Sequence, residues 1–198
     1  MKTNRKAFLI VIVLCAAYAL LAIVVPKATK SYETAEEGIA QYAGIKQEEV
    51  LVIQTVEDDA SLYTVWENTA TKEVGMTVLQ KQSWLGRSLL HPYMATGTGK
   101  TPYFNYYCAR PTSQESLFIV FCDNRDGTLG HCELQMARYY EDNSPTPLSS
   151  WTMTFSLDES VMLEVFRFPG VVQGGGSAYD HEGTPVTTAG VDFVKHGW

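Results

Sequence analysis

The sequence is poor in cysteine, and this shortage limits how the protein can be stabilised. Of its 198 residues four are cysteines, and Cys108, Cys122 and Cys132 are the three that lie outside the apolar N-terminal segment. Three cysteines are too few to hold a domain of this size together, so apolar burial must do so. One disulfide with one free thiol, and three reduced thiols, both fit this odd number.

Basic residues are also scarce beyond the first six positions. Lys2, Arg5 and Lys6 account for three of the 15 Lys and Arg residues, so residues 27–198 carry 12 basic against 22 acidic side chains, a formal charge of −10. A surface of this charge repels phosphate backbones and anionic headgroups. We therefore expect no nucleic-acid partner.

Motifs for catalysis and metal binding are missing as well. There is no G-x-S-x-G, and the histidines are scattered without a motif: His91, His131, His181 and His196. Cys108, Cys122, His131 and Cys132 are ligand types that zinc uses, but their spacing matches no usual zinc site, and His131 and Cys132 should point to opposite faces of a strand. We predict no catalytic, cofactor or metal site.

Weaker candidates have simpler interpretations. The stretch GTGKT at residues 97–101 resembles a phosphate-binding loop, but Met94 stands where the pattern requires glycine, so we interpret it as a flexible polar loop. The glycine triplet at residues 174–176 precedes no helix and is interpreted as a mobile connector. Acidic pairs at residues 58–59, 141–142 and 158–159 fit solvated turns. The aromatic cluster of Tyr103, Phe104, Tyr106 and Tyr107 predicts core filling by alternate members.

One long apolar run is present, and it begins at Ala7 and ends at Val25. Its 19 residues would form a helix of about 28 Å, close to the hydrocarbon thickness of a bilayer. A cleaved signal peptide is the alternative, because Ala17 and Ala19 form an A-x-A triplet, but the run continues for six more residues. Leu14 before Cys15 argues against lipid modification of that cysteine. We predict a single-pass cell-membrane anchor with the bulk of the chain extracytoplasmic.

The chain then divides into an anchor (residues 1–26), a juxtamembrane helical linker (27–49) and a β-rich extracytoplasmic domain (50–198). Thr34 and Glu37 have capping-box spacing, and Gly44 is a natural helix stop, so residues 31–49 should contain a short helix. Alternating apolar residues predict strands at residues 50–56, 62–66, 74–79, 103–108, 117–122, 131–136, 151–157 and 162–168, with two short ones near the end. The predicted fold is mainly β, with antiparallel hairpins or a meander forming a sandwich or curved sheet.

An internal similarity relates residues 61–80 to residues 116–135 at an offset of 55, with six identical positions and no gap. A duplication and two hairpins of similar design both explain it. In the second copy, residues 124–127 suit a hairpin turn that places Val120 opposite Cys132, Cys122 opposite Gly130 and Phe118 opposite Leu134, so that these apolar side chains share a core face. Lys72 replaces Gly127 in the first copy, which predicts a differently built turn. A further hairpin turn is indicated at residues 179–183.

The order of these pieces resembles a loose group of small, uncharacterised, membrane-anchored proteins of Gram-positive bacteria. The matching stretches are AEEGIAQYAGIKQEEVLVIQTVEDD, SLFIVFCDNRDGTLG and AYDHEGTPV. The resemblance implies an anchored topology and a β-rich exterior domain, and it carries no catalytic residues. The cysteines and the long connection at residues 84–101 are not part of that pattern.

These features favour a non-catalytic module that binds or senses a partner at the cell envelope, with another envelope protein as a possible partner. An envelope hydrolase with an unrecognised site is the alternative, and a cluster of histidine, carboxylate and hydroxyl groups in a deep pocket would support it. A passive spacer protein is the third interpretation, and it predicts neither a pocket nor a large exposed apolar patch.

Overall fold

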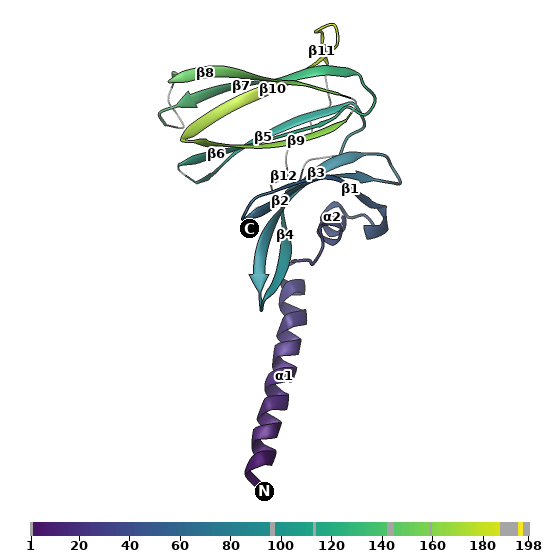
Figure 1. Ribbon diagram of the computed structural model, residues 1–198, viewed down its shortest axis with the longest axis vertical. Coiled ribbons are helices and arrows are strands. Elements are labelled where there is room, and N and C mark those ends of the chain that lie inside the picture. The colour runs from purple at the N-terminus through teal and green to yellow at the C-terminus, as the bar shows by residue number, and fades with distance from the viewer. Residues whose placement is uncertain are drawn as a thin grey trace.

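The computed structural model describes residues 2–95, 98–112, 114–141, 145–158, 160–186 and 194–195, and its strands form three stacked sheets (Figure 1). We call them basal, middle and distal, in order from the N-terminal helix. The basal sheet has the order β1-β2-β3-β4-β12 and consists of β1 (Val50–Glu57), β2 (Ser61–Asn68), β3 (Val74–Trp84), β4 (Arg87–Ala95) and β12 (Val194–Lys195). The middle sheet has the order β5-β6-β9 and consists of β5 (Tyr103–Thr112), β6 (Glu115–Asp123) and β9 (Val161–Pro169). The distal sheet has the order β11-β10-β7-β8 and consists of β7 (Leu129–Tyr139), β8 (Ser149–Ser156), β10 (Val171–Asp180) and β11 (Pro185–Val186).

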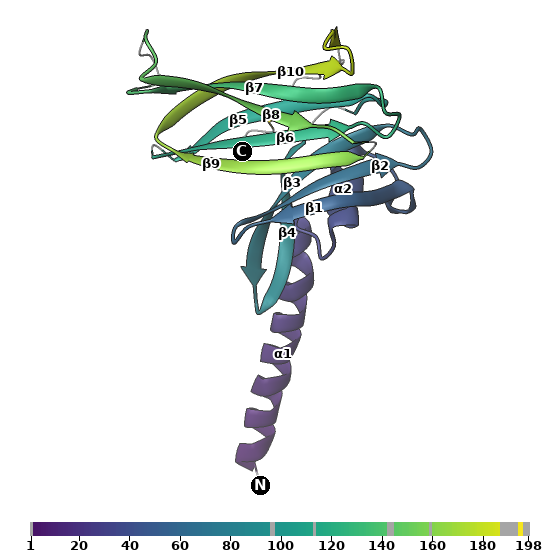
Figure 2. The same ribbon diagram turned by 45° about the horizontal axis from the view of Figure 1, so that its top comes forward.

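All of the strand pairings are antiparallel, and the predicted mainly-β fold is confirmed. Helix α1 (Lys2–Ala28) projects from the basal side of the stack, as Figures 1 and 2 show. Its apolar stretch Phe8–Pro26 has 19 residues and none of it is buried within the protein. This helix is long and apolar enough to cross a membrane, although a signal sequence would share these properties.

Helix α2 (Ala35–Ala43) forms where the capping signals predict a helix, and it is shorter than residues 31–49. The N–H of Glu37 donates to Thr34 Oγ1 at 3.2 Å, and Gly44 ends the helix with a φ of 69°. A short 3₁₀ helix, Gln47–Glu49, follows. Helix α2 covers the outer face of the basal sheet, where Ile39 is buried and Gly38 lies close to Leu79 of β3. The segment is therefore packed against the sheet.

Two hydrophobic cores separate the three sheets, and β6 contributes to both. Leu117, Ile119 and Phe121 pack into the basal core, between the basal and middle sheets. The intervening residues, Phe118, Val120 and Cys122, pack into the distal core, between the middle and distal sheets. Side chains of a strand alternate between its faces, so an unbroken apolar run is what a sheet buried on both faces requires.

The aromatic cluster of β5 follows the same alternation. Tyr103 is buried in the basal core and Tyr107 packs against it, whereas Phe104 is buried in the distal core and Tyr106 packs against that one. The prediction that these rings fill the core by alternate members is confirmed. Each fully buried ring contributes about 1.5–3 kcal/mol to folding.

The predicted hairpin of β6 with β7 is wrong. Strand β6 pairs with β5 and β9, and β7 pairs with β8 and β10, so Val120 lies opposite Glu164 and Tyr106 instead of Cys132. The connection is a β-arch, in which the two strands stack face to face in different sheets. The residues assigned to a shared core face, Phe118, Val120, Cys122, Cys132 and Leu134, are nevertheless all buried in the distal core.

The side chain of Asn124 explains why the chain crosses between sheets at this point. Its amide nitrogen donates to the carbonyl oxygens of Leu129 at 2.8 Å and Asp158 at 3.0 Å, and its oxygen accepts from Leu129 N–H at 2.7 Å. These side-chain hydrogen bonds hold the arch together in place of the backbone hydrogen bonds that would pair the two strands of a hairpin. The predicted left-handed residue is correct, because Gly127 has a φ of 68°. Lys72 is also left-handed, with a φ of 61°, but its N–H donates to Asn68 O four residues back, whereas the Gly127 N–H donates to Asn124 O three residues back, so the first turn is differently built, as predicted.

Two segments assigned to connections are strands. The glycine triplet lies inside β10, which pairs with β7, and is therefore not a mobile connector. The connection predicted for residues 84–101 contains β4, which pairs with β3 and accommodates Pro92 at a register shift. The turn predicted at residues 179–183 does join a hairpin, β10 with β11, and Gly183 has a φ of 80°.

We expect Gly176→Ala to destabilise the protein and Gly175→Ala to be tolerated. A Cβ at Gly176 would lie 2.8 Å from Tyr106 and 2.9 Å from Phe104, whereas a Cβ at Gly175 would meet only the Tyr106 hydroxyl, at 3.7 Å. Overpacking of this kind costs about 1–3 kcal/mol, and alanine also restricts the unfolded chain. Urea unfolding of the full-length chain in detergent micelles measures both effects. Equal unfolding midpoints for the two variants would contradict close packing of β10 on β5.

Candidate functional site

The thiols considered as zinc ligands or nucleophiles are buried or half-buried and unbridged. Burial raises the pKa of Cys108 to about 11 and that of Cys132 to about 12, and it also raises the pKa of Cys122. A protonated thiol is a poor nucleophile and a poor metal ligand. Cys132 faces the distal core while His131 stacks on Tyr179 with ring centroids 4.8 Å apart, so the two neighbours point to opposite faces, as predicted. In the described part of the chain, no group of three or more His, Cys, Asp or Glu side chains could hold a metal ion.

The other candidates from the sequence have structural roles or are dispersed. Gly99 of the GTGKT stretch donates its N–H to Val74 O at 3.0 Å, so that group is not available to a phosphate, and Gly97 lies outside the described residues. His91 is on β4, His131 on β7 and His181 in the β10–β11 turn, while His196 lies outside the described residues. Of the acidic pairs, Asp142 and Glu159 also lie outside them.

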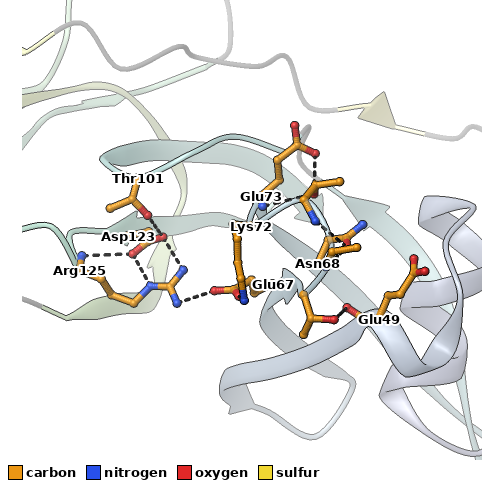
Figure 3. A network of polar contacts seen from close by, with 11 residues as sticks. Glu49, Glu67, Asn68, Lys72, Glu73, Thr101, Asp123 and Arg125 are labelled. Atoms are coloured by element: carbon orange, nitrogen blue, oxygen red, sulfur yellow. Dashed lines mark hydrogen bonds and ion pairs between the residues drawn. The ribbon is translucent and has the colours of Figure 1, made fainter.

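A group of charged side chains lies where the β2–β3 turn meets the β6–β7 arch, and we call it the Arg125 cluster (Figure 3). Arg125 donates through Nε and Nη2 to the two oxygens of Asp123 at 2.9 and 3.0 Å, and through Nη1 to Glu67 at 2.5 Å. Lys72 donates to the other oxygen of Glu67 at 3.0 Å, and Thr101 donates to Asp123 at 2.5 Å. The five side chains thus connect the basal sheet to the middle sheet.

Two carboxyl groups of the Arg125 cluster are buried, and burial opposes their ionisation. Asp123 is fully buried and Glu67 is 5 % exposed, so burial alone would raise the pKa of each carboxyl. The hydrogen bonds from Arg125 to both, from Lys72 to Glu67 and from Thr101 to Asp123 outweigh burial and hold both pKa values below their ordinary range. Both carboxylates are ionised and hydrogen-bonded, which is typical of a structural clamp and not of a general acid or base.

A second clamp joins the same two sheets through Arg167 of β9, and we call it the Arg167 cluster. Arg167 donates to Asp58 of the β1–β2 turn, to Glu115 of β6 at 2.8 Å and to the Tyr63 hydroxyl at 3.1 Å. Burial, followed by the neighbouring Asp58 carboxylate, raises the pKa of Tyr63 to about 12. Asp58 lies in a turn, as predicted, and accepts the N–H groups of Ala60 and Ser61, but it is only partly exposed and also joins the two sheets through Arg167.

Neither clamp is predicted from the sequence, although one signal for the Arg125 cluster is present. At the offset of 55 residues, Asn68 aligns with Asp123 and Lys72 with Gly127. Asn68 Oδ1 accepts the Ala70 N–H at 2.9 Å, and Asp123 Oδ1 accepts the Arg125 N–H at 3.2 Å, so the two turns are locally alike. The structure brings these two similar turns into contact through Arg125 and Glu67.

A groove of about 560 Å³ lies between the end of α1, helix α2 and β4. Its lining includes apolar residues of the α1 end, among them Ile23 and Pro26, and charged residues, among them Glu33 and Arg87. Among the described residues its lining has no histidine or cysteine, so it does not combine the histidine, carboxylate and hydroxyl groups that a hydrolytic site would need.

Strand β8 offers a different kind of site, the free edge of a sheet. The edge strand β1 of the basal sheet lies against β9, and β5 of the middle sheet lies against β10. In the described part of the chain β8 pairs with β7 alone. Its sequence SSWTMTFS is uncharged, and exposed Thr152 and Thr154 alternate with half-buried Trp151 and Met153. An uncharged edge without proline is a template for pairing with another strand.

Replacing Arg125 should destabilise the fold, more strongly with Met than with Lys. Arg125→Met leaves the buried carboxylates of Asp123 and Glu67 without their main partner, which we expect to cost about 3 kcal/mol at neutral pH. Arg125→Lys keeps the charge but cannot bridge both carboxylates in the same way, so an intermediate loss is expected. Urea unfolding in micelles measures both, and wild-type midpoints for both variants would contradict the clamp.

The difference between wild type and Arg125→Met should shrink as the pH falls. The pKa values of Asp123 and Glu67 are depressed in the fold, so their stabilising contribution is complete above the unfolded values of about 4 and is lost below them. In the variant the same buried carboxyls favour protonation, which recovers stability in acid. Unfolding free energies measured from pH 7 down to acid pH test this, and a constant difference would contradict it.

Comparison of the chain with protein-family models, with curated proteins and with solved structures finds no match. The resemblance to anchored proteins of Gram-positive bacteria therefore stays a prediction. The function has to be inferred from the geometry of α1, the two arginine clusters and the free edge of β8.

Proposed function

We propose that the protein is a membrane-anchored, non-catalytic binding module whose β-rich domain lies outside the cytoplasm and takes up a partner strand along β8. The single observation that carries this proposal is the uncharged free edge of β8, eight residues long and on the sheet farthest from α1 (Figure 1). Strand addition to such an edge gains main-chain hydrogen bonds, and the side chains along the edge select the partner.

The anchor is supported by the exposed apolar surface of α1. Phe8 is 66 % exposed and Leu20 is 65 % exposed, although the rest of the chain builds two cores of its own. Such a surface is costly in water and favourable in lipid. Three basic residues, Lys2, Arg5 and Lys6, precede the run and two, Lys27 and Lys30, follow it, which favours an orientation with the N-terminus inside.

The partner is inferred to be another protein of the envelope, since a membrane anchor restricts the domain to that layer. The β8 edge lies in the distal sheet, which is the layer most remote from the membrane end. Exposed Tyr140 and Leu148, near the ends of the β7–β8 connection, extend the accessible apolar surface at one end of the edge. Aromatic and aliphatic side chains of this kind favour a protein partner.

A photo-crosslinker at Thr154 of the full-length protein, in its native membrane, should give one discrete protein adduct. Thr152→Lys should abolish the adduct, because a lysine on the edge opposes strand pairing without entering the core. Gln135→Lys is the matched control, since Gln135 pairs with Thr152 but lies on the interior strand β7. Loss of the adduct in both variants, or no adduct at Thr154, would contradict binding along β8. Turnover of a wall or lipid substrate by the purified protein would contradict the non-catalytic assignment.

A further inference from the structure

The turn of the β3–β4 hairpin lies beside the C-terminal end of α1 (Figure 1). Tyr32, just after the helix, forms an antiparallel bridge with Leu90, and at the other end the Tyr18 hydroxyl donates to the Leu85 carbonyl at 3.2 Å. Five residues of strand from Leu85 to Leu90 span about 17 Å, so the hairpin extends from the Tyr32 bridge back past the end of the helix toward its apolar stretch.

Polar contacts also hold the hairpin to the chain just after α1. Arg87 forms an ion pair with Glu33, and Ser31 Oγ donates to Gln82 Oε1 at 3.2 Å. Together with the Tyr32–Leu90 bridge, they tie the hairpin to the base of the helix, so the height of its tip relative to α1 is defined.

The height of the tip conflicts with an arrangement in which only α1 enters the bilayer. Tyr18 is eight residues, or about 12 Å of helix, before Pro26, and its side chain reaches the tip at Leu85, so the tip lies below the end of the apolar stretch. If the membrane surface lay at Tyr18, the apolar residues below it would span roughly half of the 30 Å hydrocarbon layer. The full stretch Phe8–Pro26 is needed to cross the layer, so the tip lies at the depth of lipid.

The residues of the tip suit that position. Leu85 is 38 % exposed and has a φ of 51°, a left-handed conformation that a leucine rarely adopts. Neighbouring Trp84 is half-buried, and tryptophan is enriched at the boundary between lipid and water. Arg87 is partly exposed beside Glu33, and a long arginine side chain can extend toward the headgroups.

We propose that the β3–β4 tip, residues 83–87, inserts into the outer leaflet beside α1, with Leu85 among the acyl chains and Trp84 nearer the headgroups. The inference rests on the proposed membrane anchor. It adds a second attachment to the lipid, so that the domain is held at a defined height and orientation instead of turning freely about one helix.

Depth-dependent quenching tests the insertion in full-length protein. In a Cys15→Ala background, Leu85→Cys carries an environment-sensitive fluorophore, and the protein is reconstituted in vesicles of phosphatidylethanolamine and phosphatidylglycerol. Nitroxide-labelled lipids should quench this label several-fold more than the same label at Leu148→Cys, a site that is 65 % exposed on the distal side. Aqueous iodide should give the opposite order. The Cys15→Ala protein without a new cysteine corrects for labelling of native thiols.

The outcomes separate this inference from the proposed function. A Leu85→Cys label that behaves like the Leu148→Cys label, in protein that resists alkaline extraction, overturns the insertion and leaves the anchor intact. Release of the protein by alkali overturns both. Exposed Ser83→Cys provides a second label position in case Leu85→Cys fails to fold, and it should also be shielded from iodide.

Discussion

Burial of the middle sheet on both faces is the constraint on which the rest of the structure depends. Three strands are too few to be stable unless their apolar faces are covered, and here β6 presents apolar side chains to both sides. The basal and distal sheets each have one apolar face, and each buries that face only by packing against the middle sheet. The three layers are therefore expected to fold as one cooperative unit.

The polar clamps provide specificity that apolar burial alone lacks. Sheet faces covered with aliphatic and aromatic side chains can slide against one another at modest cost, but Arg125 and Arg167 each join carboxylates of the basal and middle sheets. A fully buried Asp123 is tolerated only with its oxygens engaged, so a shifted packing of the sheets would leave that charge without partners. The clamps thereby favour one alignment of the two sheets.

Features set by neighbouring residues could be predicted from the sequence, and features set by distant ones could not. The cap at Thr34, the stop at Gly44 and the left-handed residue Gly127 depend on local geometry. The same is true of the alternation of aromatic side chains along β5. The partners of β6 are chosen among strands of similar apolar pattern, and a turn sequence that fits a hairpin also fits an arch once Asn124 bonds to Leu129 and Asp158.

The missed elements and contacts have the same physical origin. Proline in β4 and glycines in β10 are unfavourable in strands; Pro92 is tolerated at a register shift, and Gly174 and Gly176 are required by close neighbours in space. Gly176 leaves room for the rings of Phe104 and Tyr106, a requirement that is visible only when β5 and β10 are placed together. Glu67 and Arg125 are 58 residues apart, so their ion pair depends on the packing of two sheets and has no local signal.

The stacked architecture also connects the membrane end to the proposed binding edge. The chain just after α1 is tied to the β3–β4 hairpin by the Arg87–Glu33 ion pair and the Tyr32–Leu90 bridge, and β3 contributes Met76 and Val78 to the basal core. Because neighbouring sheets pack about 10 Å apart, the distal sheet lies roughly 20 Å beyond the basal one. With the two proposed attachments to lipid, α1 and the hairpin tip, rotation of this stack would be restricted. The β8 edge would then be presented at a defined height above the bilayer, which would reduce the orientational freedom lost on binding of the proposed partner strand.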